Sequence, residues 1–150
     1  MKFKEALERA AALCSGQERN TREMLRKLSE WGVGEEDSEK IIQRLKAERF
    51  LDDRRYASSY VKDKFRFNRW GRMKIRFALR QKGIPEDMIE EALDQIDQEE
   101  YFQVCRDLLG QKSATLKEKD PYARKARLLR FASQRGFESD LIYRILQSDE

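Results

Sequence analysis

One short pattern occurs three times in this chain and constrains its fold more than any other feature. A helical segment ends at a glycine that is followed by an apolar residue, and the three glycines lie 51 and 53 residues apart. These sites are Trp31-Gly32-Val33, Lys82-Gly83-Ile84 and Arg135-Gly136-Phe137. A glycine in the left-handed conformation is the usual residue just beyond a helix, and the apolar residue after it packs back on the last turn. Self-similarity at such a period indicates a repeat protein.

Each glycine is flanked by two helical segments, and a further helix precedes each pair, over residues 3–13, 53–67 and 99–109. Strand signals are nearly absent. The sequence therefore predicts an all-α fold, an elongated array of three tandem three-helix repeats that resemble helix-turn-helix units. The predicted boundaries are 1–49, 50–97 and 98–150. The polar, lysine-rich stretch 110–119 is expected to be a mobile loop.

The residue types that are missing exclude much chemistry. There is no histidine, which removes the commonest general base and histidine-ligated metals. Cys14 and Cys105 stand among apolar residues and form no Cys-x-x-Cys, so we expect buried free thiols. No glycine-rich phosphate-binding loop is present. We expect no enzyme activity, no cofactor and no metal. The longest apolar run has five residues and no signal peptide is evident, so we expect a cytoplasmic protein that does not enter membranes.

Charge is strongly segregated along the chain. Residues 54–82 carry 11 basic side chains and one acidic one, whereas residues 83–120 carry 4 basic and 11 acidic ones. A basic block of this kind is typical of a surface for a polyanion or an acidic partner. The alternative is that the acidic block folds back on the basic one and neutralises it.

The basic residues of this block keep helical spacing. Arg72, Arg76 and Arg80 recur every four residues, and a second stripe precedes them. We define the predicted contact surface as the basic ridge, made of Lys62, Arg66, Arg69, Arg72, Lys74, Arg76 and Arg80. Arginine suits phosphate and carboxylate equally well through its bidentate fork. Trp70, at the junction of the two stripes, could stack on a base or belong to the core.

Two adjacent carboxylates, Asp52 and Asp53, precede Tyr56 at the start of the second repeat. They are interpreted as a helix-cap motif, in which one aspartate caps the helix and the other lies in its first turn near the positive end of the dipole. The alternative is a metal-dependent nuclease site. Neither aspartate has further acids nearby in a metal-ligand pattern, which favours the cap.

The middle of the chain resembles the RecX family of bacterial regulatory proteins. The resemblance rests on Leu51-Asp52-Asp53-Arg54-Arg55-Tyr56-Ala57, Trp70-Gly71-Arg72-Met73-Lys74-Ile75 and Leu79-Arg80-Gln81-Lys82-Gly83-Ile84. It is strongest over residues 50–97, and the repeat plan extends it over nearly the whole chain.

The resemblance implies a non-enzymatic modulator of the RecA recombinase. Members of the family resemble a curved array of three three-helix repeats that lies in the groove of the RecA–DNA filament. Such a protein limits filament growth, ATP hydrolysis and strand exchange, and so acts in DNA repair, homologous recombination and the SOS response. The implied partners are the RecA filament and single- or double-stranded DNA, and we expect a monomer in the bacterial cytoplasm. The alternative function is an independent DNA- or RNA-binding helical repeat protein.

Overall fold

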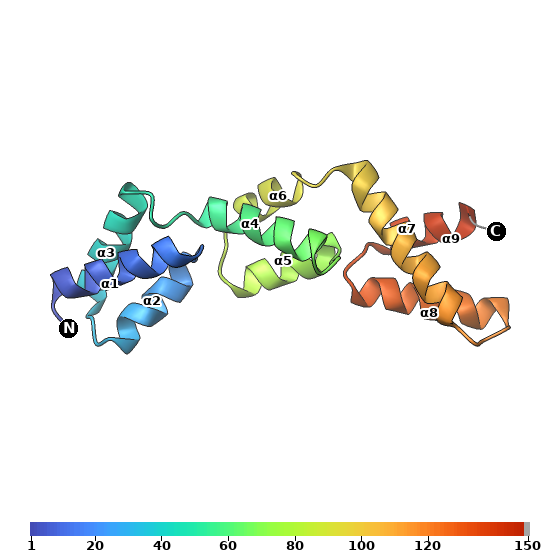
Figure 1. Cartoon of the computed structure of the whole chain (residues 1–150), viewed down its shortest axis with the longest axis horizontal. Helices are drawn as coiled ribbons and strands as arrows, with labels where there is room; N and C mark the ends of the chain where they lie inside the picture. The colour runs from blue at the N-terminus through green and yellow to red at the C-terminus, as the bar shows by residue number, and fades with distance from the viewer. Residues whose placement is uncertain (149–150) are drawn as a thin grey trace. The chain divides into compact units, whose positions relative to one another are not determined.

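The computed structural model describes residues 1–148, and these are all helical or irregular, with no strand among them. Figure 1 shows the helices in chain order. The predicted all-α fold is therefore confirmed for the described residues. Their bounds are α1 Phe3–Gly16, α2 Thr21–Glu30, α3 Glu35–Ala47, α4 Asp53–Arg66, α5 Arg72–Gln81, α6 Glu86–Leu93, α7 Gln98–Thr115, α8 Pro121–Gln134 and α9 Ser139–Ser148.

The three repeated glycines end the second helix of each repeat as expected. Gly32, Gly83 and Gly136 have φ of 79°, 78° and 99°. In the first repeat, the Val33 N–H donates to the Leu28 carbonyl at 3.0 Å, and the same bond recurs in the other two repeats. This is the Schellman arrangement, which satisfies carbonyls that a helix end leaves open. The glycine is required there because a Cβ destabilises the left-handed conformation.

Several helices begin at a polar cap. The side chains of Asn20, Asp97 and Asp120 each accept a hydrogen bond from the backbone N–H three residues further on, at 2.8, 2.9 and 3.0 Å. An oxygen in this position satisfies one of the amides that the first turn leaves without a partner. These caps fix where α2, α7 and α8 start.

The predicted loop over residues 110–119 is wrong for its first half, because α7 continues to Thr115. Gly110 is exposed and does not break the helix, since only proline interrupts a helix interior strongly. The remaining turn is held by Arg124 of α8. Its guanidinium donates to the carbonyls of Ser113, Leu116 and Glu118 at 2.9, 3.3 and 2.9 Å.

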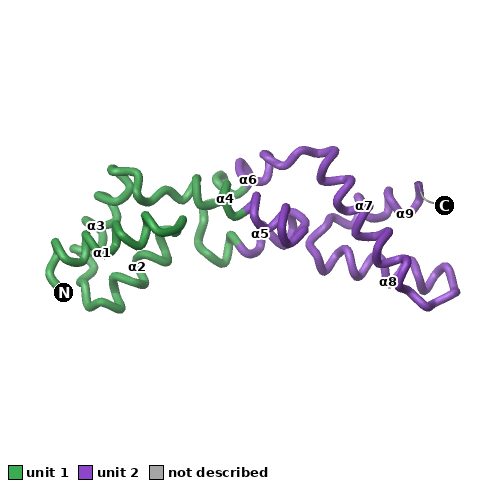
Figure 2. The backbone as a smooth tube through the Cα atoms, viewed as in Figure 1, with its two compact units in different colours: residues 1–60, 79–89 green, residues 61–78, 90–150 purple. Residues whose placement is uncertain are grey.

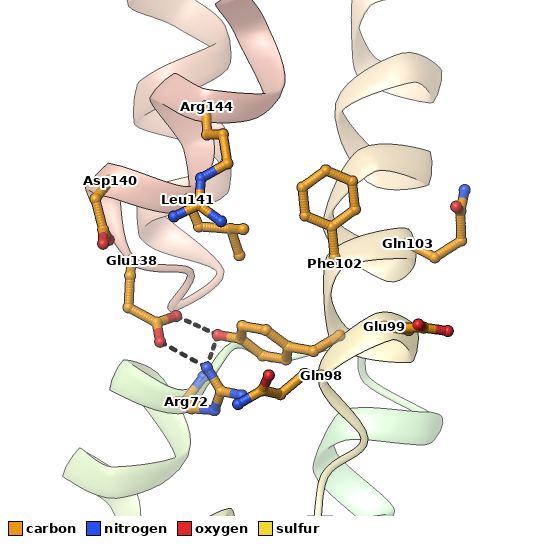
Figure 3. A pocket seen from close by; sticks show the side chains of 10 residues that line it. Arg72, Gln98, Glu99, Phe102, Gln103, Glu138, Asp140, Leu141 and Arg144 are labelled. Atoms are coloured by element: carbon orange, nitrogen blue, oxygen red, sulfur yellow. Dashed lines mark hydrogen bonds and ion pairs between the residues drawn. The ribbon is translucent and has the colours of Figure 1, made fainter. Parts of the chain in front are cut away.

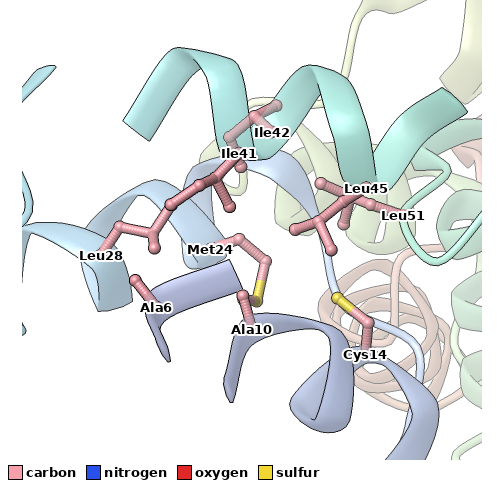
Figure 4. Close-up of a cluster of buried hydrophobic side chains, with 9 residues drawn as sticks. All are labelled: Ala6, Ala10, Cys14, Met24, Leu28, Ile41, Ile42, Leu45 and Leu51. Carbon is pink, nitrogen blue, oxygen red and sulfur yellow. The ribbon is translucent and has the colours of Figure 1, made fainter. Parts of the chain in front are cut away.

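The first repeat has a well-defined apolar core (Figure 4). Alanines on one face of α1 allow α2 and α3 to approach closely, and larger side chains from those helices fill the space between them. Burying a leucine or isoleucine of this kind stabilises a fold by about 1.5–3 kcal/mol. The core consists of Ala6, Ala10, Cys14, Met24, Leu28, Ile41, Ile42 and Leu45, together with Leu51 from the start of the second repeat.

The chain divides into two compact units whose boundary does not fall between repeats (Figure 2). The first unit contains residues 1–60 and 79–89, and the second contains residues 61–78 and the described chain from residue 90 onward. The boundary therefore passes through α4, α5 and α6. The middle repeat contributes to both units, so each unit combines an outer repeat with part of the middle one. The repeat boundaries and the elongated arrangement stay predictions.

Both cysteines are free and buried. Burial raises the pKa of the Cys105 thiol to about 12 and also raises the pKa of Cys14. A thiol is inert when its thiolate is disfavoured in this way. Over residues 1–148, no group of three or more cysteine and carboxylate side chains is arranged to hold a metal ion, and no helix is long and apolar enough to span a bilayer.

Candidate interaction surface

In the first unit, the start of α4 is joined to the start of α2. Asp52 precedes α4 and accepts a hydrogen bond from the backbone N–H three residues on, at 3.1 Å. Asp53 reaches across to α2 and accepts from the Thr21 N–H at 2.8 Å. The Tyr56 side chain is hydrogen-bonded to Asn20, and burial raises the pKa of this tyrosine. Both carboxylates thus bind backbone amides, and this bonding accounts for the pair without a metal.

In the second unit, the start of α5 is capped by the third repeat. The N–H groups of residues 71, 72 and 73 donate to the Arg135 carbonyl, the Tyr101 hydroxyl and the Gly136 carbonyl at 2.7, 2.9 and 2.9 Å. The first amides of a helix have no acceptor within the helix. Here the acceptors come from α7 and from the turn between α8 and α9, so the third repeat completes a helix of the second.

This junction requires two glycines. A Cβ on Gly71 would lie 2.3 Å from the Gly136 carbonyl carbon, and a Cβ on Gly136 would lie 2.5 Å from the Lys74 Cβ. Both separations are far below contact distance. The repeat alignment places Gly71 opposite Asn20, which caps α2 with its own side chain. Without a side chain, Gly71 provides no such cap, but it allows the neighbouring backbone to approach and supply the acceptors instead.

Tyr101 lies at the centre of the same junction. Its side chain is buried, its ring packs 5.8 Å from Phe65 and 5.2 Å from Phe137, and its hydroxyl donates to the Glu138 carboxylate while accepting from the Arg72 N–H. The Arg72 guanidinium lies 3.9 Å above the ring and donates to Glu138 at 3.0 Å. Burial, and then the hydrogen bond to Glu138, raise the pKa of the tyrosine hydroxyl well above its usual range.

Tyr101→Phe is expected to destabilise the protein by about 2 kcal/mol, because it leaves the Arg72 N–H without its acceptor and removes a donor from Glu138. Urea unfolding followed by circular dichroism measures this loss. Tyr122→Phe is the matched control, since the Tyr122 side chain is 83% exposed, and it should change stability by less than about 0.5 kcal/mol. Equal losses of stability in the two variants would contradict the role given to the Tyr101 hydroxyl at this junction.

A pocket of about 640 Å³ opens beside this junction (Figure 3). Arg72 and Glu138 face each other at one end, with Phe102 on α7 and Leu141 and Arg144 on α9 along the sides. Its lining carries two basic and three acidic side chains. The lining residues are Arg72, Gln98, Glu99, Tyr101, Phe102, Gln103, Glu138, Asp140, Leu141 and Arg144.

Three arginines of the basic ridge are held in ion pairs. In the second unit, Arg72 pairs with Glu138 at 3.0 Å, and Arg76 binds Glu90 through two hydrogen bonds of 2.6 and 3.1 Å. In the first unit, Arg80 forms a two-bond pair with Glu86. Glu86 and Glu90 belong to the acidic block that follows the ridge. The acidic block 83–120 thus neutralises part of the basic block 54–82 at Arg76 and Arg80, as the alternative reading of the sequence expected.

The other members of the ridge differ in their surroundings. Lys62 and Arg66 lie one turn apart on α4 and are exposed, and Arg69 follows with a positive φ of 55°. None of these three has an acidic partner among residues 1–148. The Lys74 Nζ lies 4.4 Å from the ring of half-buried Trp70, whose ring also has the Lys64 Nζ at 4.9 Å.

Sequence reasoning missed an apolar component in the same part of the second unit. Phe67, Met73 and Phe77 expose 82%, 54% and 63% of their surface. Met73 and Phe77 are one turn apart on α5 and lie off the buried stripe of Ile75 and Leu79. The sequence carries a signal for this exposure. Met73 and Phe77 are four residues apart and share a face of the helix, and that face is not the one of Ile75 and Leu79.

The fold and surface define a class of protein: a tandem array of three-helix domains with a mixed basic and apolar surface. Comparison with known families agrees. Models of the first, second and third three-helix domains of RecX match residues 6–45, 52–93 and 98–146. The chain belongs to the RecX family of regulatory proteins.

Several relatives named "Regulatory protein RecX" support this assignment. The relative from Chlorobaculum tepidum is 35% identical over 137 residues, which cover 91% of this chain and 83% of that protein. The relative from Prosthecochloris aestuarii is 33% identical over 143 residues, which cover 95% and 92%. One from Clostridium botulinum is 39% identical over 118 residues, and the match spans 77% of this chain but only 55% of that protein.

Solved structures agree with the fold. A crystal structure described as regulatory protein RecX has a TM-score of 0.88 and 29% identity, covering 99% of this chain and 72% of that one. The crystal structure of RecX from Lactobacillus salivarius has a TM-score of 0.91 at 23% identity, covering 97% and 95%.

Proposed function

We propose that the protein modulates the RecA recombinase by binding the RecA–DNA filament, and that it limits filament growth, ATP hydrolysis and strand exchange. Membership of the RecX family supports a regulatory role. The proposed partner is the filament, approached by a monomer in the bacterial cytoplasm. In this role the protein needs no cofactor and catalyses no reaction.

One observation supports a protein partner most directly. The second unit exposes cations, at Lys62 and Arg66, together with large apolar side chains, at Phe67 and Phe77. Protein interfaces combine aromatic residues and methionine with arginine, and exposed apolar patches mark sites where proteins meet. A surface for naked nucleic acid would need the cations far more than the apolar side chains.

The ion pairs narrow the proposed contact surface. Arg72, Arg76 and Arg80 are each held by a carboxylate, so a partner would have to displace that carboxylate to use them. Lys62 and Arg66, which are exposed, and half-buried Arg69 have no carboxylate partner in the described chain that would have to be displaced. We therefore propose that Lys62, Arg66 and Arg69 make the main electrostatic contact, and that the three paired arginines act mainly within the fold.

The test is RecA ATP hydrolysis on single-stranded DNA, titrated with this protein, beside binding of the protein to the same DNA without RecA. Inhibition well below the stoichiometric ratio to RecA, with weak binding to naked DNA, is the expected result. Inhibition that requires the DNA to be saturated would overturn the proposal. The chain would then be an independent nucleic-acid-binding repeat protein that competes with RecA for DNA.

A further inference from the structure

A small basic hollow lies between the last turn of α7 and one face of α8, apart from the basic ridge. Its volume is about 160 Å³, and its lining residues are Lys112, Arg127, Arg130, Phe131 and Gln134. We propose that this hollow binds a backbone phosphate of single-stranded nucleic acid. The proposal goes beyond RecA modulation, because it assigns the third repeat a nucleic-acid contact of its own.

The helical periodicity brings these residues together. Arg127, Arg130, Phe131 and Gln134 fall on one face of α8, since residues three, four and seven apart share a face. Lys112 comes from the last turn of α7. Between residues 112 and 135 the chain holds eight basic and two acidic side chains. The hollow is therefore the centre of a second basic region of the sequence.

The cations are held in place by an aromatic ring and one ion pair. The Lys112 Nζ lies 5.3 Å from the centre of the Phe131 ring, and the Arg135 guanidinium lies 5.1 Å from it. Arg127 uses its Nε to bind Glu118 at 2.9 Å. Arg130 is exposed, and none of the acidic residues in the described chain pairs with it. A cation held over an aromatic face loses little entropy when it binds an anion.

The size and chemistry of the hollow favour phosphate. Pockets for drug-sized ligands measure about 300–1,000 Å³, so this one admits a single small anion and leaves the attached groups outside. Its lining contains three cations and an amide and no carboxylate. A flat carboxylate is satisfied by one arginine fork, whereas the oxygens of a phosphate accept from several directions at once. Donors from two helices suit the phosphate.

The test is the salt dependence of binding to a fluorescein-labelled oligothymidylate, measured by anisotropy in the absence of RecA. Each phosphate neutralised on a single strand contributes about 0.7 to the slope of log affinity against log salt. Because the hollow is proposed to bind one phosphate, Lys112→Gln/Arg130→Gln should lower that slope by about 0.7 and weaken binding at low salt. Arg26→Gln/Lys46→Gln is the matched control, because both side chains are exposed, lie in the first repeat and carry the same charge.

Three outcomes would overturn the proposal. The first is an unchanged slope in the hollow variant, and the second is an equal fall of the slope in the control, which would indicate nonspecific charge. The third is displacement of the oligonucleotide by polyglutamate from the parent protein but not from the hollow variant, which would indicate that the hollow binds an acidic protein partner. Helicity measured by circular dichroism confirms that each variant folds. The readout here is the change in slope between the hollow variant and the parent, whereas the RecA proposal is tested by inhibition of ATP hydrolysis, so failure of either test can be told from failure of the other.

Discussion

Gly71→Ala should lower the free energy of unfolding by about 3 kcal/mol, the largest stability effect we expect from removing or adding a single methyl group in this chain. The new Cβ would lie 2.3–2.4 Å from backbone atoms of Gly136 and Phe137, which cannot move aside as a flexible side chain can. Relief requires the turn between α8 and α9 to withdraw. That movement breaks the hydrogen bonds that cap the start of α5.

Gly110→Ala is a control with the opposite expected sign. Gly110 lies inside α7, and a Cβ there would meet nothing within 4 Å. Alanine in a helix interior is favoured over glycine by about 1 kcal/mol, so this variant should be more stable than the parent. Urea unfolding at a common temperature measures both variants. If Gly71→Ala left the unfolding midpoint unchanged, the close approach of the two turns would be refuted.

Lys62→Glu/Arg66→Glu should raise the amount of protein needed for half-inhibition of RecA ATP hydrolysis by about tenfold or more, if the proposed contact holds. Reversal of these two exposed charges, neither of which is paired with a carboxylate in the described chain, replaces attraction with repulsion. About 1.4 kcal/mol of lost binding free energy is sufficient for a tenfold change. The fold should be unaffected, because both side chains are solvated.

Arg26→Glu/Lys46→Glu provides the comparison for this experiment. It changes the net charge equally, on exposed positions of the first repeat. A loss of inhibition common to both double variants would reflect overall charge and would rule out the proposed surface. Added salt gives a second readout, since inhibition by the parent protein should weaken as salt rises while the difference between parent and Lys62→Glu/Arg66→Glu narrows.

The repeat plan and the helix ends could be predicted from the sequence because they depend on local physics. Gly32, Gly83 and Gly136 take positive φ because each helix ends where an apolar residue packs back. Asn20 and Asp120 cap helices because their side chains reach an amide three residues away. The end of α7 was misjudged because Gly110 and its polar neighbours resemble a loop in composition, yet nothing in the stretch forbids a helix.

The junctions between repeats could not be predicted, because they join residues far apart in the chain. Nothing local in the sequence shows that Tyr101 accepts a hydrogen bond from residue 72, or that Gly71 needs its missing side chain to admit Gly136. The pairing of Arg76 with Glu90 was one of two readings of the charge blocks. The choice between an exposed basic block and a paired one depends on how the chain turns at Gly83, which decides whether α6 lies against α5.

The hollow on α8 could not be predicted from charge counted along the sequence. Lys112 lies in the acidic block 83–120, whereas Arg127 and Arg130 lie beyond it. The irregular segment 116–120 joins α7 to α8, and these side chains line one site. Net charge counted over a stretch of sequence therefore misses a basic site whose side chains come from two different stretches.

The capping of α5 by the third repeat also sets an order of events during synthesis on the ribosome. The N–H groups of residues 71–73 emerge long before Tyr101, Arg135 and Gly136, which supply their acceptors. Until those residues leave the exit tunnel, the first turn of α5 can bond only to water. A nascent chain should therefore hold a frayed first turn of α5 until residues 101–136 of the third repeat have been made and can supply its acceptors.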